Sequence, residues 1–428
     1  MSPAPRSAPL CSLPDLDAMT ADLTDIDADL RAALQRSSLQ PLRLAGRRLL
    51  PIVQGGMGVG ISAHRLAGSV AALGAVGTIS SVDLRRHHPD LMERTRDCRV
   101  GEAAKATINA ANLEALEREI VAARALAQGH GMIAINVMRA VSEYAPSVTR
   151  ALQAGVDAVV VGAGLPLDLP DLARDHPDVA LIPILSDARG VAVVVKKWER
   201  KQRLPDAIVI EHPRWAGGHL GAAGLADLHD PRFDFENVVP QTLAFLRGAG
   251  IEREVPLIVA GGIRTFEDIV RVQSLGAAAV QLGTPFVATE ECDAHPEFKR
   301  VLAEAREEDL IEFTSVAGLP ARAVNTPWLQ HYLAALPRLQ GSAHKKPRCT
   351  LAFDCLAQCG LRDGLPGWGQ FCIDTQLAAG LRGDLKKGLF FRGAGALPFG
   401  HQIATVRALL DRLLTPGVPL GTPSAAPA

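Results

Sequence analysis

Short apolar runs rich in β-branched residues recur along the chain as far as about residue 286, and most of the runs end in glycine or a polar residue. Stretches rich in Ala, Leu and Arg with helical periodicity separate the runs, a pattern typical of repeated strand–helix units around a parallel sheet. The runs are apolar almost throughout, as strands covered on both faces require. The predicted strands are residues 51–56, 75–80, 132–138, 157–164, 180–186, 207–212, 256–262 and 279–286. Eight parallel units favour an α/β fold of the (β/α)8 TIM barrel type.

Longer segments outside this repeat divide the chain further. Between the second and third strands, about fifty residues include a helical pattern and predict a helical insertion. Beyond the eighth strand the pattern is mostly helical, and both ends of the chain have the Pro, Ala, Ser and Gly-rich composition typical of disorder. The expected organisation is an N-terminal segment, partly disordered (1–45), a barrel (46–289) with its insertion (about 81–131), a helical accessory region (290–415) and a disordered tail (416–428).

The charge balance and hydropathy of the chain limit its expected partners. Lys and Arg number 45 against 46 Asp and Glu, a formal net charge of -1, so the whole-chain attraction that nucleic acid or an anionic membrane needs is absent. No uncharged apolar stretch reaches the length of about eighteen residues that spans a membrane, and the start of the chain lacks the pattern of a signal peptide. We therefore expect a cytoplasmic protein without nucleic-acid or membrane partners.

The first predicted strand ends in a glycine-rich turn, and active sites of such barrels are built at the carboxyl ends of the strands. Gln54, Gly55, Gly56 and Met57 form this turn, in which a backbone without bulky side chains can approach a flat ligand closely. The alternative is a tight turn with a structural role alone, because glycine-rich loops by themselves are not specific to binding. We regard the turn as a candidate cofactor contact.

Two further glycine turns close the seventh and eighth strands. They comprise Gly261 and Gly262 after the seventh strand and Gln281, Leu282, Gly283 and Thr284 after the eighth. Barrel enzymes commonly hold a phosphate at these two positions, because free N–H groups and helix N-termini present positive potential there. Ordinary strand-to-helix turns are the alternative, but the joint position of the two turns favours a phosphate site.

A histidine follows the sixth strand in a glycine-rich setting. Gly217 and Gly218 directly precede His219. Consecutive glycines reduce local stability and leave the imidazole ring accessible, so core packing, the ordinary role of a lone histidine, explains this arrangement poorly. An imidazole at the mouth of the barrel can act as a general base or as a hydrogen-bond donor. His219 is therefore the candidate catalytic residue.

These turns, in this order, resemble the nitronate monooxygenase family, also called 2-nitropropane dioxygenases, whose members bind FMN on a TIM barrel. The resemblance covers about residues 51–286, and its most specific element is the segment Ala-Gly-Gly-His-Leu-Gly at 216–221. It implies that His219 is catalytic and that Asn136, at the end of the third strand, contacts the cofactor. With the glycine turns, the expected cofactor contacts are Gln54, Gly55, Gly56, Met57, Asn136, Gly217, Gly218, Gly261, Gly262, Gln281, Leu282, Gly283 and Thr284.

One position departs from the family pattern. The family often has Gln five residues before the first Gly of the Ala-Gly-Gly-His motif, and this chain has His212 there. The family contact to the flavin from this position is therefore not expected in the same form, and the exact substrate is left open.

The resemblance implies an FMN-dependent oxidoreductase, most directly one that oxidises alkyl nitronates or nitroalkanes with O2 to a carbonyl compound and nitrite. FMN-dependent enoyl-acyl-carrier-protein reductases share the barrel, the turns and the Gly-Gly-His histidine, so reduction of an activated double bond by NAD(P)H is the alternative. A non-catalytic flavin-binding or metal-binding protein is a third hypothesis. The expected partners are a small-molecule substrate and either O2 or NAD(P)H as co-substrate.

Four of the seven cysteines lie close together in the accessory region. They are Cys349, Cys355, Cys359 and Cys372. Clustered thiolates suit zinc or an iron–sulfur cluster, but no Cys-x-x-Cys pair is present. A metal site and ordinary reduced cysteines therefore both remain open.

Overall fold

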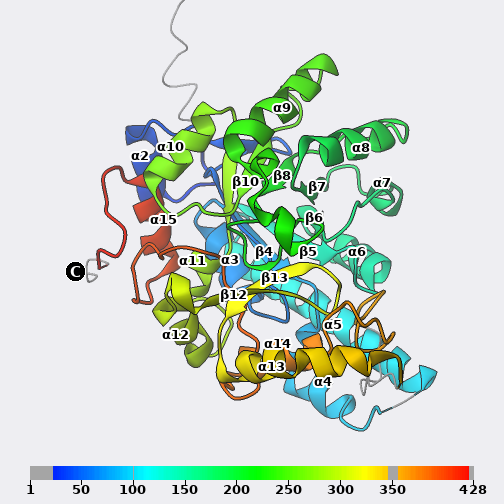
Figure 1. Cartoon of the computed structure of the whole chain (residues 1–428). Helices are drawn as coiled ribbons and strands as arrows, with labels where there is room; N and C mark the ends of the chain where they lie inside the picture. The colour runs from blue at the N-terminus through cyan, green and yellow to red at the C-terminus, as the bar shows by residue number, and fades with distance from the viewer. Residues whose placement is uncertain (1–22, 100, 346–354, 424–428) are drawn as a thin grey trace, which may run out of the picture.

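Eight parallel strands close into a barrel in the computed structural model, which describes residues 23–99, 101–345 and 355–423 (Figure 1). The barrel strands are β3 (Ile52–Gln54), β4 (Val76–Ser80), β5 (Met132–Met138), β6 (Ala158–Gly162), β7 (Ala180–Leu185), β8 (Ile208–Glu211), β10 (Leu257–Ala260) and β11 (Ala279–Leu282). Neighbours in this order pair with one another, β8 pairs with β10, and β11 closes the ring on β3. All eight predicted strands and the barrel itself are confirmed.

Small aliphatic side chains fill the inside of the barrel. Val53, Val160 and Ile258 belong to this inner core, together with leucines of a hairpin formed by β1 (Leu42–Leu44) and β2 (Arg47–Leu49). Residues next to them along the strands, such as Ile52, pack instead into the larger core beneath the helices. The alternation of side chains along each strand therefore separates two cores, and the interior is packed rather than open.

Helices cover the outside of the barrel. They are α3 (His64–Ala72), α5 (Glu102–Ala127), α6 (Tyr144–Gln153), α7 (Leu169–Leu172), α8 (Ala188–Glu199), α9 (Phe235–Gly248), α10 (Phe266–Ser274) and α11 (Thr284–Val287). The predicted helical insertion after the second barrel strand consists of η1 (Leu84–His87), α4 (Pro89–Arg94) and α5. Of these, α5 packs along α3 and β5 and so also provides the crossover between β4 and β5, as each parallel pair requires.

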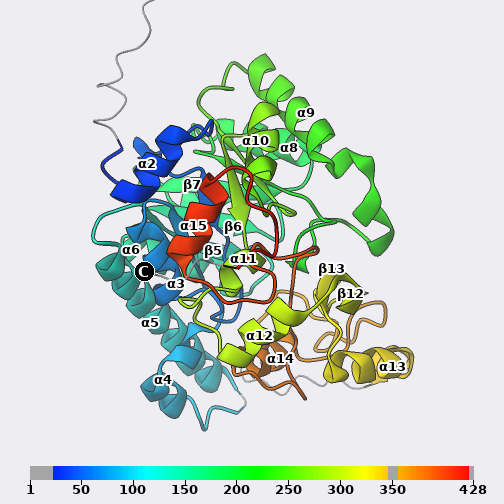
Figure 2. The ribbon, with the colours of Figure 1, turned by 90° about the vertical axis from the view of Figure 1, so that its left-hand side faces the viewer.

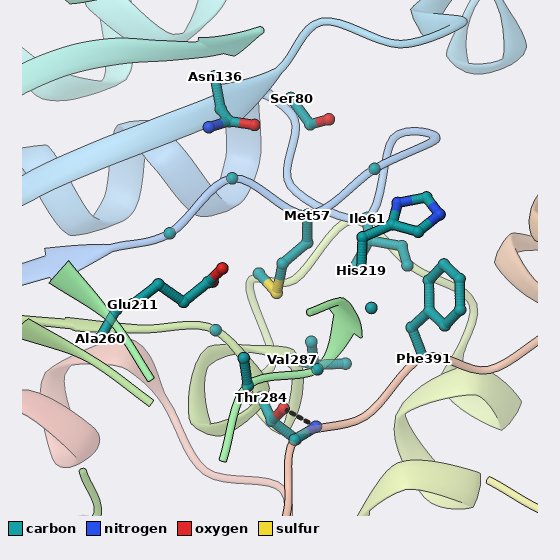
Figure 3. A pocket seen from close by; sticks show the side chains of 18 of the residues that line it. Met57, Ile61, Ser80, Asn136, Glu211, His219, Ala260, Thr284, Val287 and Phe391 are labelled. Carbon is teal, nitrogen blue, oxygen red and sulfur yellow. Dashed lines mark hydrogen bonds between the residues drawn. The ribbon is translucent and has the colours of Figure 1, made fainter. Parts of the chain in front are cut away.

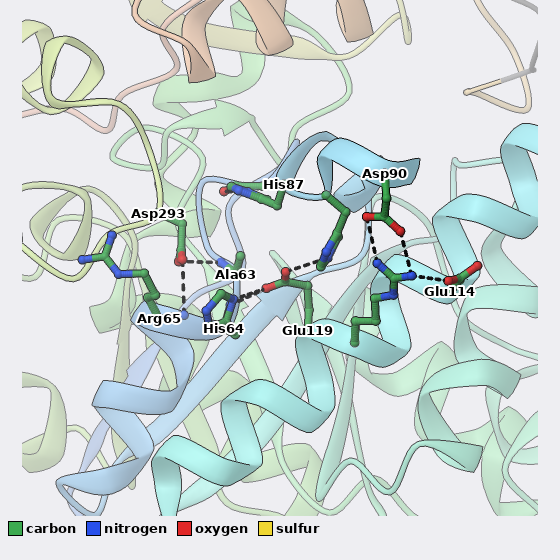
Figure 4. Close-up of polar contacts among 11 residues, drawn as sticks. Ala63, His64, Arg65, His87, Asp90, Glu114, Glu119 and Asp293 are labelled. Atoms are coloured by element: carbon green, nitrogen blue, oxygen red, sulfur yellow. Dashed lines mark hydrogen bonds and ion pairs between the residues drawn. The ribbon is translucent and has the colours of Figure 1, made fainter. Parts of the chain in front are cut away.

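Polar contacts fix the start of α3, which directly follows the first glycine turn (Figure 4). Ala63 precedes the helix and offers no capping side chain, so the Asp293 carboxylate accepts hydrogen bonds from the N–H groups of Ala63 (2.9 Å) and Leu66 (3.1 Å) instead. Buried Glu119 of α5 accepts from the backbone N–H of His64 (2.8 Å) and lies 2.9 Å from the His88 ring. These contacts hold the glycine turn, α5 and the insertion in fixed positions.

The accessory region combines helices with a small antiparallel sheet (Figures 1 and 2). Its helices are α12 (Pro296–Glu304), α13 (Pro327–Gly341), α14 (Ile373–Leu381) and α15 (Val406–Leu414). The sheet has the order β12 (Leu310–Thr314), β13 (Pro320–Val324) and β9 (Gly218–His219). We did not predict this sheet. β9 has only two residues and so no periodicity to detect, and β12 and β13 lie in a region that we expected to be mostly helical. Short 3-10 turns complete the described elements: η2 (Leu225–His229), η3 (Pro231–Phe233), η4 (Glu307–Asp309) and η5 (Ala343–Lys345).

The two ends of the described chain meet on the barrel. Helix α2 (Ala28–Arg36) contacts α15, and α15 also contacts α3 and α10. Figure 2 shows α15 lying beside α2 and α3. Residues 416–423 belong to the segment expected as a disordered tail; here the N–H of Gly417 donates to Glu267 (2.8 Å) and the Arg412 guanidinium donates to the Thr422 carbonyl (2.7 Å). Residues 1–22, which belong to the N-terminal segment expected to be partly disordered, and residues 424–428 of the expected tail lie outside the described residues. Within the described ranges, no helix has the length and apolar character that crossing a membrane requires.

Candidate active site

A cavity of about 290 Å³ lies at the carboxyl ends of the barrel strands (Figure 3). The structure brings nearly all of the predicted site residues to its wall. They are Gly55, Gly56, Met57, Asn136, Gly217, Gly218, His219, Gly261, Gly262, Gln281, Leu282, Gly283 and Thr284. Segments far apart in the sequence converge there because the ends of parallel strands meet at one edge of the barrel.

Gln54 is the exception among the predicted cofactor contacts. Its side-chain amide accepts a hydrogen bond from the N–H of Thr78 (2.8 Å) and donates to the Thr78 carbonyl (3.1 Å). The residue is fully buried and does not line the cavity. Gln54 therefore braces β3 against β4, and the cavity-facing part of the turn begins at Gly55.

His219 is held by the accessory region. It lies in β9 and pairs with Ala321 of β13, and the N–H of Leu220 donates to the Pro320 carbonyl (2.8 Å). Buried Arg322 donates to the Ala216 carbonyl (2.5 Å) and forms an ion pair with Glu312. The glycine-rich segment is therefore fixed by an antiparallel pairing and by a buried arginine.

The imidazole of His219 has an unusual environment. Phe391 packs beside it with ring centroids 5.7 Å apart (Figure 3), and Nε2 is buried without a hydrogen-bond partner in the described part of the chain. Burial lowers the pKa of His219 to about 4, because desolvation disfavours the charged ring. The ring is therefore neutral at physiological pH and holds one N–H donor and one basic nitrogen.

The end of β8 presents a carboxyl group to the cavity, which we did not predict. Glu211 lines the cavity and points into it (Figure 3), whereas His212 does not line it. Instead, the His212 ring lies 3.2 Å from the Asp234 carboxylate, and its centroid lies 5.4 Å from that of Phe235. Successive side chains of a strand point to opposite sides, so only one of these two residues can face the cavity. The family departure at His212 is therefore a buried structural residue, and Glu211 takes the cavity position.

Glycine turns and Arg264 form one side of the cavity. The N–H of Gly393, from the accessory region, donates to the Thr284 hydroxyl (2.9 Å), and a Cβ at Gly217 would lie only 2.5 Å from the Gly393 nitrogen. The pKa of the Arg392 guanidinium is lowered by burial and, secondarily, by the positive charge of Arg264. Buried Arg392 donates to the carbonyls of Leu302 and Gly393 and does not line the cavity. In the described cavity wall, Arg264 is therefore the guanidinium that can meet an anionic group at the glycine turns.

The helix N-terminus after β10 contributes less to such an anion site than expected. Asp268 accepts hydrogen bonds from the N–H groups of Arg264 (2.9 Å) and Thr265 (3.1 Å), and the Thr265 hydroxyl accepts from the N–H of Asp268 (3.2 Å). These capping contacts satisfy the first donors of α10. A phosphate is therefore left to the glycine turns and Arg264, rather than to the N-terminus of α10.

Apolar side chains form the outer wall of the cavity. Val82 comes from the insertion, Val141 from the loop after β5, and Leu356, Ile373 and Leu377 from the accessory region. An apolar wall opposite a few polar groups is typical of a site for a small molecule. The insertion and the accessory region therefore complete a site that the barrel alone leaves open.

The cysteine-bearing loop is only partly described. Cys349 lies outside the described residues, Cys355 lines the cavity, and Cys372 accepts a hydrogen bond from the Thr375 hydroxyl (3.1 Å). Within residues 23–99, 101–345 and 355–423, no three His, Cys, Asp or Glu side chains are grouped as metal ligands. Zinc or iron–sulfur binding by Cys349, Cys355, Cys359 and Cys372 stays a prediction, which elemental analysis of purified protein tests directly.

Reasoning from the sequence also missed the accessory contacts to the cavity. Phe391, Gly393, Ala394, Ala396 and Leu397 all line it. The glycine-rich run Gly-Ala-Gly-Ala at 393–396 is the sequence feature that could have indicated these contacts. It lies, however, more than one hundred residues beyond the last barrel strand. Nothing in the sequence places that run beside the eighth strand.

Comparison with protein families and curated proteins identifies relatives of this chain. The family model described as nitronate monooxygenase matches residues 47–414. A protein of Bacillus subtilis named "Probable nitronate monooxygenase" is 26% identical over 286 residues, which cover 65% of this chain and 78% of that protein. A protein of the same name from Staphylococcus saprophyticus is 25% identical over 188 residues, covering 44% of this chain and 49% of that protein.

Solved structures share the fold at low sequence identity. FabK from Thermotoga maritima has a TM-score of 0.57 and 19% identity, covering 91% of this chain and 95% of that chain. The nitroalkane oxidase from Streptomyces ansochromogenes has a TM-score of 0.55 and 18% identity, covering 89% of this chain and 96% of that chain. At this level of identity, the similarity shows the fold alone.

Proposed function

The chain belongs to the nitronate monooxygenase family and is a flavin-dependent oxidoreductase, and on this premise we propose that it binds FMN in the cavity and oxidises alkyl nitronates and nitroalkanes. O2 is the oxidant, and the products are a carbonyl compound and nitrite. The main observation in support of this proposal is that His219 presents a neutral imidazole on the cavity wall, with a buried Nε2 that has no hydrogen-bond partner among the described residues.

The residues around the cavity fit FMN. A buried polar atom without a partner, such as Nε2 of His219, is uncommon in native proteins and is explained by a group bound beside it. Backbone at Gly55 and Gly56 and the Asn136 amide suit the planar, hydrogen-bonding ring. The turn at Gly283, with the nearby Arg264, suits the phosphate.

The proposed roles of the residues follow from their chemistry. When bound, FMN would supply the redox chemistry that links oxidation of the substrate to reduction of O2. His219 removes the α-proton of a neutral nitroalkane through its basic nitrogen, or donates a hydrogen bond to a nitro oxygen through its N–H. Phe391 holds the ring in place on one side, and the apolar outer wall keeps water away from the reacting carbon.

An anaerobic reduction experiment tests the reaction class. Purified protein loaded with FMN is mixed without O2 with an alkyl nitronate or with NAD(P)H, and the flavin absorbance is followed. We expect the nitronate to bleach the flavin rapidly and NAD(P)H to bleach it slowly or not at all. Rapid bleaching by NAD(P)H alone would contradict nitronate oxidation and favour the reduction of an activated double bond.

Substitution of Gly283 tests the phosphate site. A Cβ at Gly283 would meet only the Met57 side chain, at ordinary distances of 3.7 Å from Sδ and 3.9 Å from Cγ. The fold should therefore accept Gly283→Val, while the valine occupies the approach to the phosphate. Loss of one or two charge-assisted hydrogen bonds, at about 1.5–3 kcal/mol each, should raise the Kd for FMN by about 10²-fold. The measurement is equilibrium binding of FMN to the variant.

A matched glycine and a thermal melt complete this test. Gly248→Val at the end of α9 places its Cβ in open space, so FMN binding should be unchanged. Gly262 is less suitable, because its φ of +76° and a Cβ 3.0 Å from Trp215 would strain any substitution. Normal FMN binding by a folded Gly283→Val variant would place the phosphate elsewhere.

A further inference from the structure

We propose that Glu211 is a flavin contact that takes up a proton when FMN binds, so that it meets the ring as a neutral carboxyl group donating a hydrogen bond. This inference rests on the proposed binding of FMN in the cavity. FMN binding is then coupled to protonation of Glu211. This residue precedes position 212, at which the family often has the glutamine that contacts the flavin.

The geometry places the Glu211 carboxyl on the cavity wall. Glu211 is the last residue of β8, and Figure 3 shows its side chain pointing into the cavity between Met57 and Ala260. On its other side, a Cβ at Gly221 would lie 3.9 Å from Oε2. A ligand that fills the cavity therefore covers the carboxyl.

The carboxyl has no polar partner among the described residues. In the described ranges, neither a hydrogen bond nor an ion pair to a Glu211 oxygen is found. Burial alone raises the pKa of Glu211 to about 7. A buried carboxylate without a cation is strongly disfavoured, and such a group takes up a proton instead.

The ionisable groups around the cavity do not compensate Glu211. His219, Arg264, Cys355 and Asp374 line the same cavity, and His212 is its neighbour in the chain. His219 is neutral above about pH 4, and Asp374 is paired with Arg86. None of these groups contributes to the raised pKa of Glu211, which has desolvation as its only cause.

Binding of FMN should strengthen this effect. A bound ring displaces the water that reaches the carboxyl and adds no positive charge to it, so the ionised form becomes less favourable still. The neutral form can donate its O–H to an oxygen or nitrogen acceptor of the ring. The pKa of Glu211 is about 7 before FMN binds and higher once the ring covers the carboxyl. The contribution of the contact to FMN affinity is therefore full below about pH 7 and decreases as the pH rises toward the pKa of the bound form.

Calorimetric titration of FMN into the full chain stripped of flavin tests the proposal. Between pH 7 and 9 the phosphate, whose second pKa is about 6, stays dianionic. We expect the Kd of the wild-type protein to rise by up to about tenfold per pH unit, as uptake of one proton requires. Titrations in buffers of different ionisation enthalpy should count about one proton taken up per FMN at pH 8.

Two substitutions at adjacent residues separate Glu211 from other titrating groups. Glu211→Gln keeps a neutral hydrogen-bond donor and should bind FMN with a Kd that changes less than about twofold over the same range. His212→Asn keeps an acceptor for the N–H of Arg214, which now bonds to the His212 ring (3.3 Å), and should retain the wild-type pH dependence. Thermal melts show that both variants are folded.

The outcomes distinguish this inference from the proposal on which it rests. FMN binding with the same pH dependence in the wild type and in Glu211→Gln would overturn the role of Glu211 and leave the cofactor in place. Affinity that increases with pH in the wild type would show an ionised Glu211 accepting a hydrogen bond, and would also overturn it. No FMN binding at any pH, in any of the three proteins, would overturn both proposals.

Discussion

His219→Ala should lower the turnover of a neutral nitroalkane by a factor on the order of 10² to 10⁴, the usual contribution of a positioned proton acceptor. FMN binding should survive, because the glycine turns and Arg264 that suit the phosphate lie elsewhere on the wall. A preformed nitronate has already lost its α-proton, so its oxidation should decrease less. Steady-state kinetics with both substrates measure the difference.

The controls for this prediction use pH and a second histidine. His229→Ala removes an exposed histidine ten residues further along the chain and should leave both rates unchanged. The active ring is the neutral one, so the His219-dependent rate should hold above about pH 5 and fall as the pH drops through about 4. An equal decrease on both substrates would show that His219 orients substrate or stabilises charge instead of removing a proton.

Arg86→Ala should lower the free energy of unfolding by about 3–5 kcal/mol at pH 8, the effect of removing one partner from a buried ion pair. The Arg86 guanidinium lies 2.5 Å from both Asp83 and Asp374, whose side chains are 0% and 1% exposed. Asp83 keeps a second partner in Arg85 at 2.7 Å. Without Arg86, the carboxylate of Asp374 loses the cation that opposes its desolvation.

The pH dependence of this loss identifies its cause. Burial and, secondarily, the charge of Asp83 raise the pKa of Asp374 to about 7 despite Arg86, so its neutral form is favoured in the folded protein at acidic pH and that stability is lost as the pH rises toward 7. The loss in Arg86→Ala should therefore be smaller at pH 5.5 than at pH 8. Urea titrations at both values measure it.

An exposed ion pair of the same insertion provides the reference. Arg96 and Glu93 lie 2.9 Å apart with 64% of each side chain exposed, so Arg96→Ala should change the free energy of unfolding by less than about 1 kcal/mol. A similarly small change in Arg86→Ala at pH 8 would mean that the pair between the insertion and α14 does not stabilise the fold.

The sequence determined the barrel and the glycine turns of the cavity wall. Strands buried on both faces must be apolar along almost their whole length, so each of the eight strands appears in the sequence as a nearly continuous apolar run. The residues at the end of each run can therefore be read directly from the sequence. Closure of the barrel then brings strand ends to one edge without further information. Gly56 and Gly283 were predicted for this reason, and His219 was predicted from the two glycines before it and from the family motif.

Tertiary structure alone decided which side chains face the cavity and what completes it. A shift of one residue reverses the side to which a strand residue points, and the sequence does not give the register of β8 to that accuracy, so Glu211 was missed and His212 was considered instead. The side chain of Gln54 bonds to the backbone of Thr78 and does not face the cavity, which the sequence likewise does not specify. Phe391 and Gly393 reach the cavity through packing between segments more than one hundred residues apart, which no local pattern encodes. The two-residue pairing of β9 with β13, which holds His219, exists only because the accessory region folds back over the mouth of the barrel.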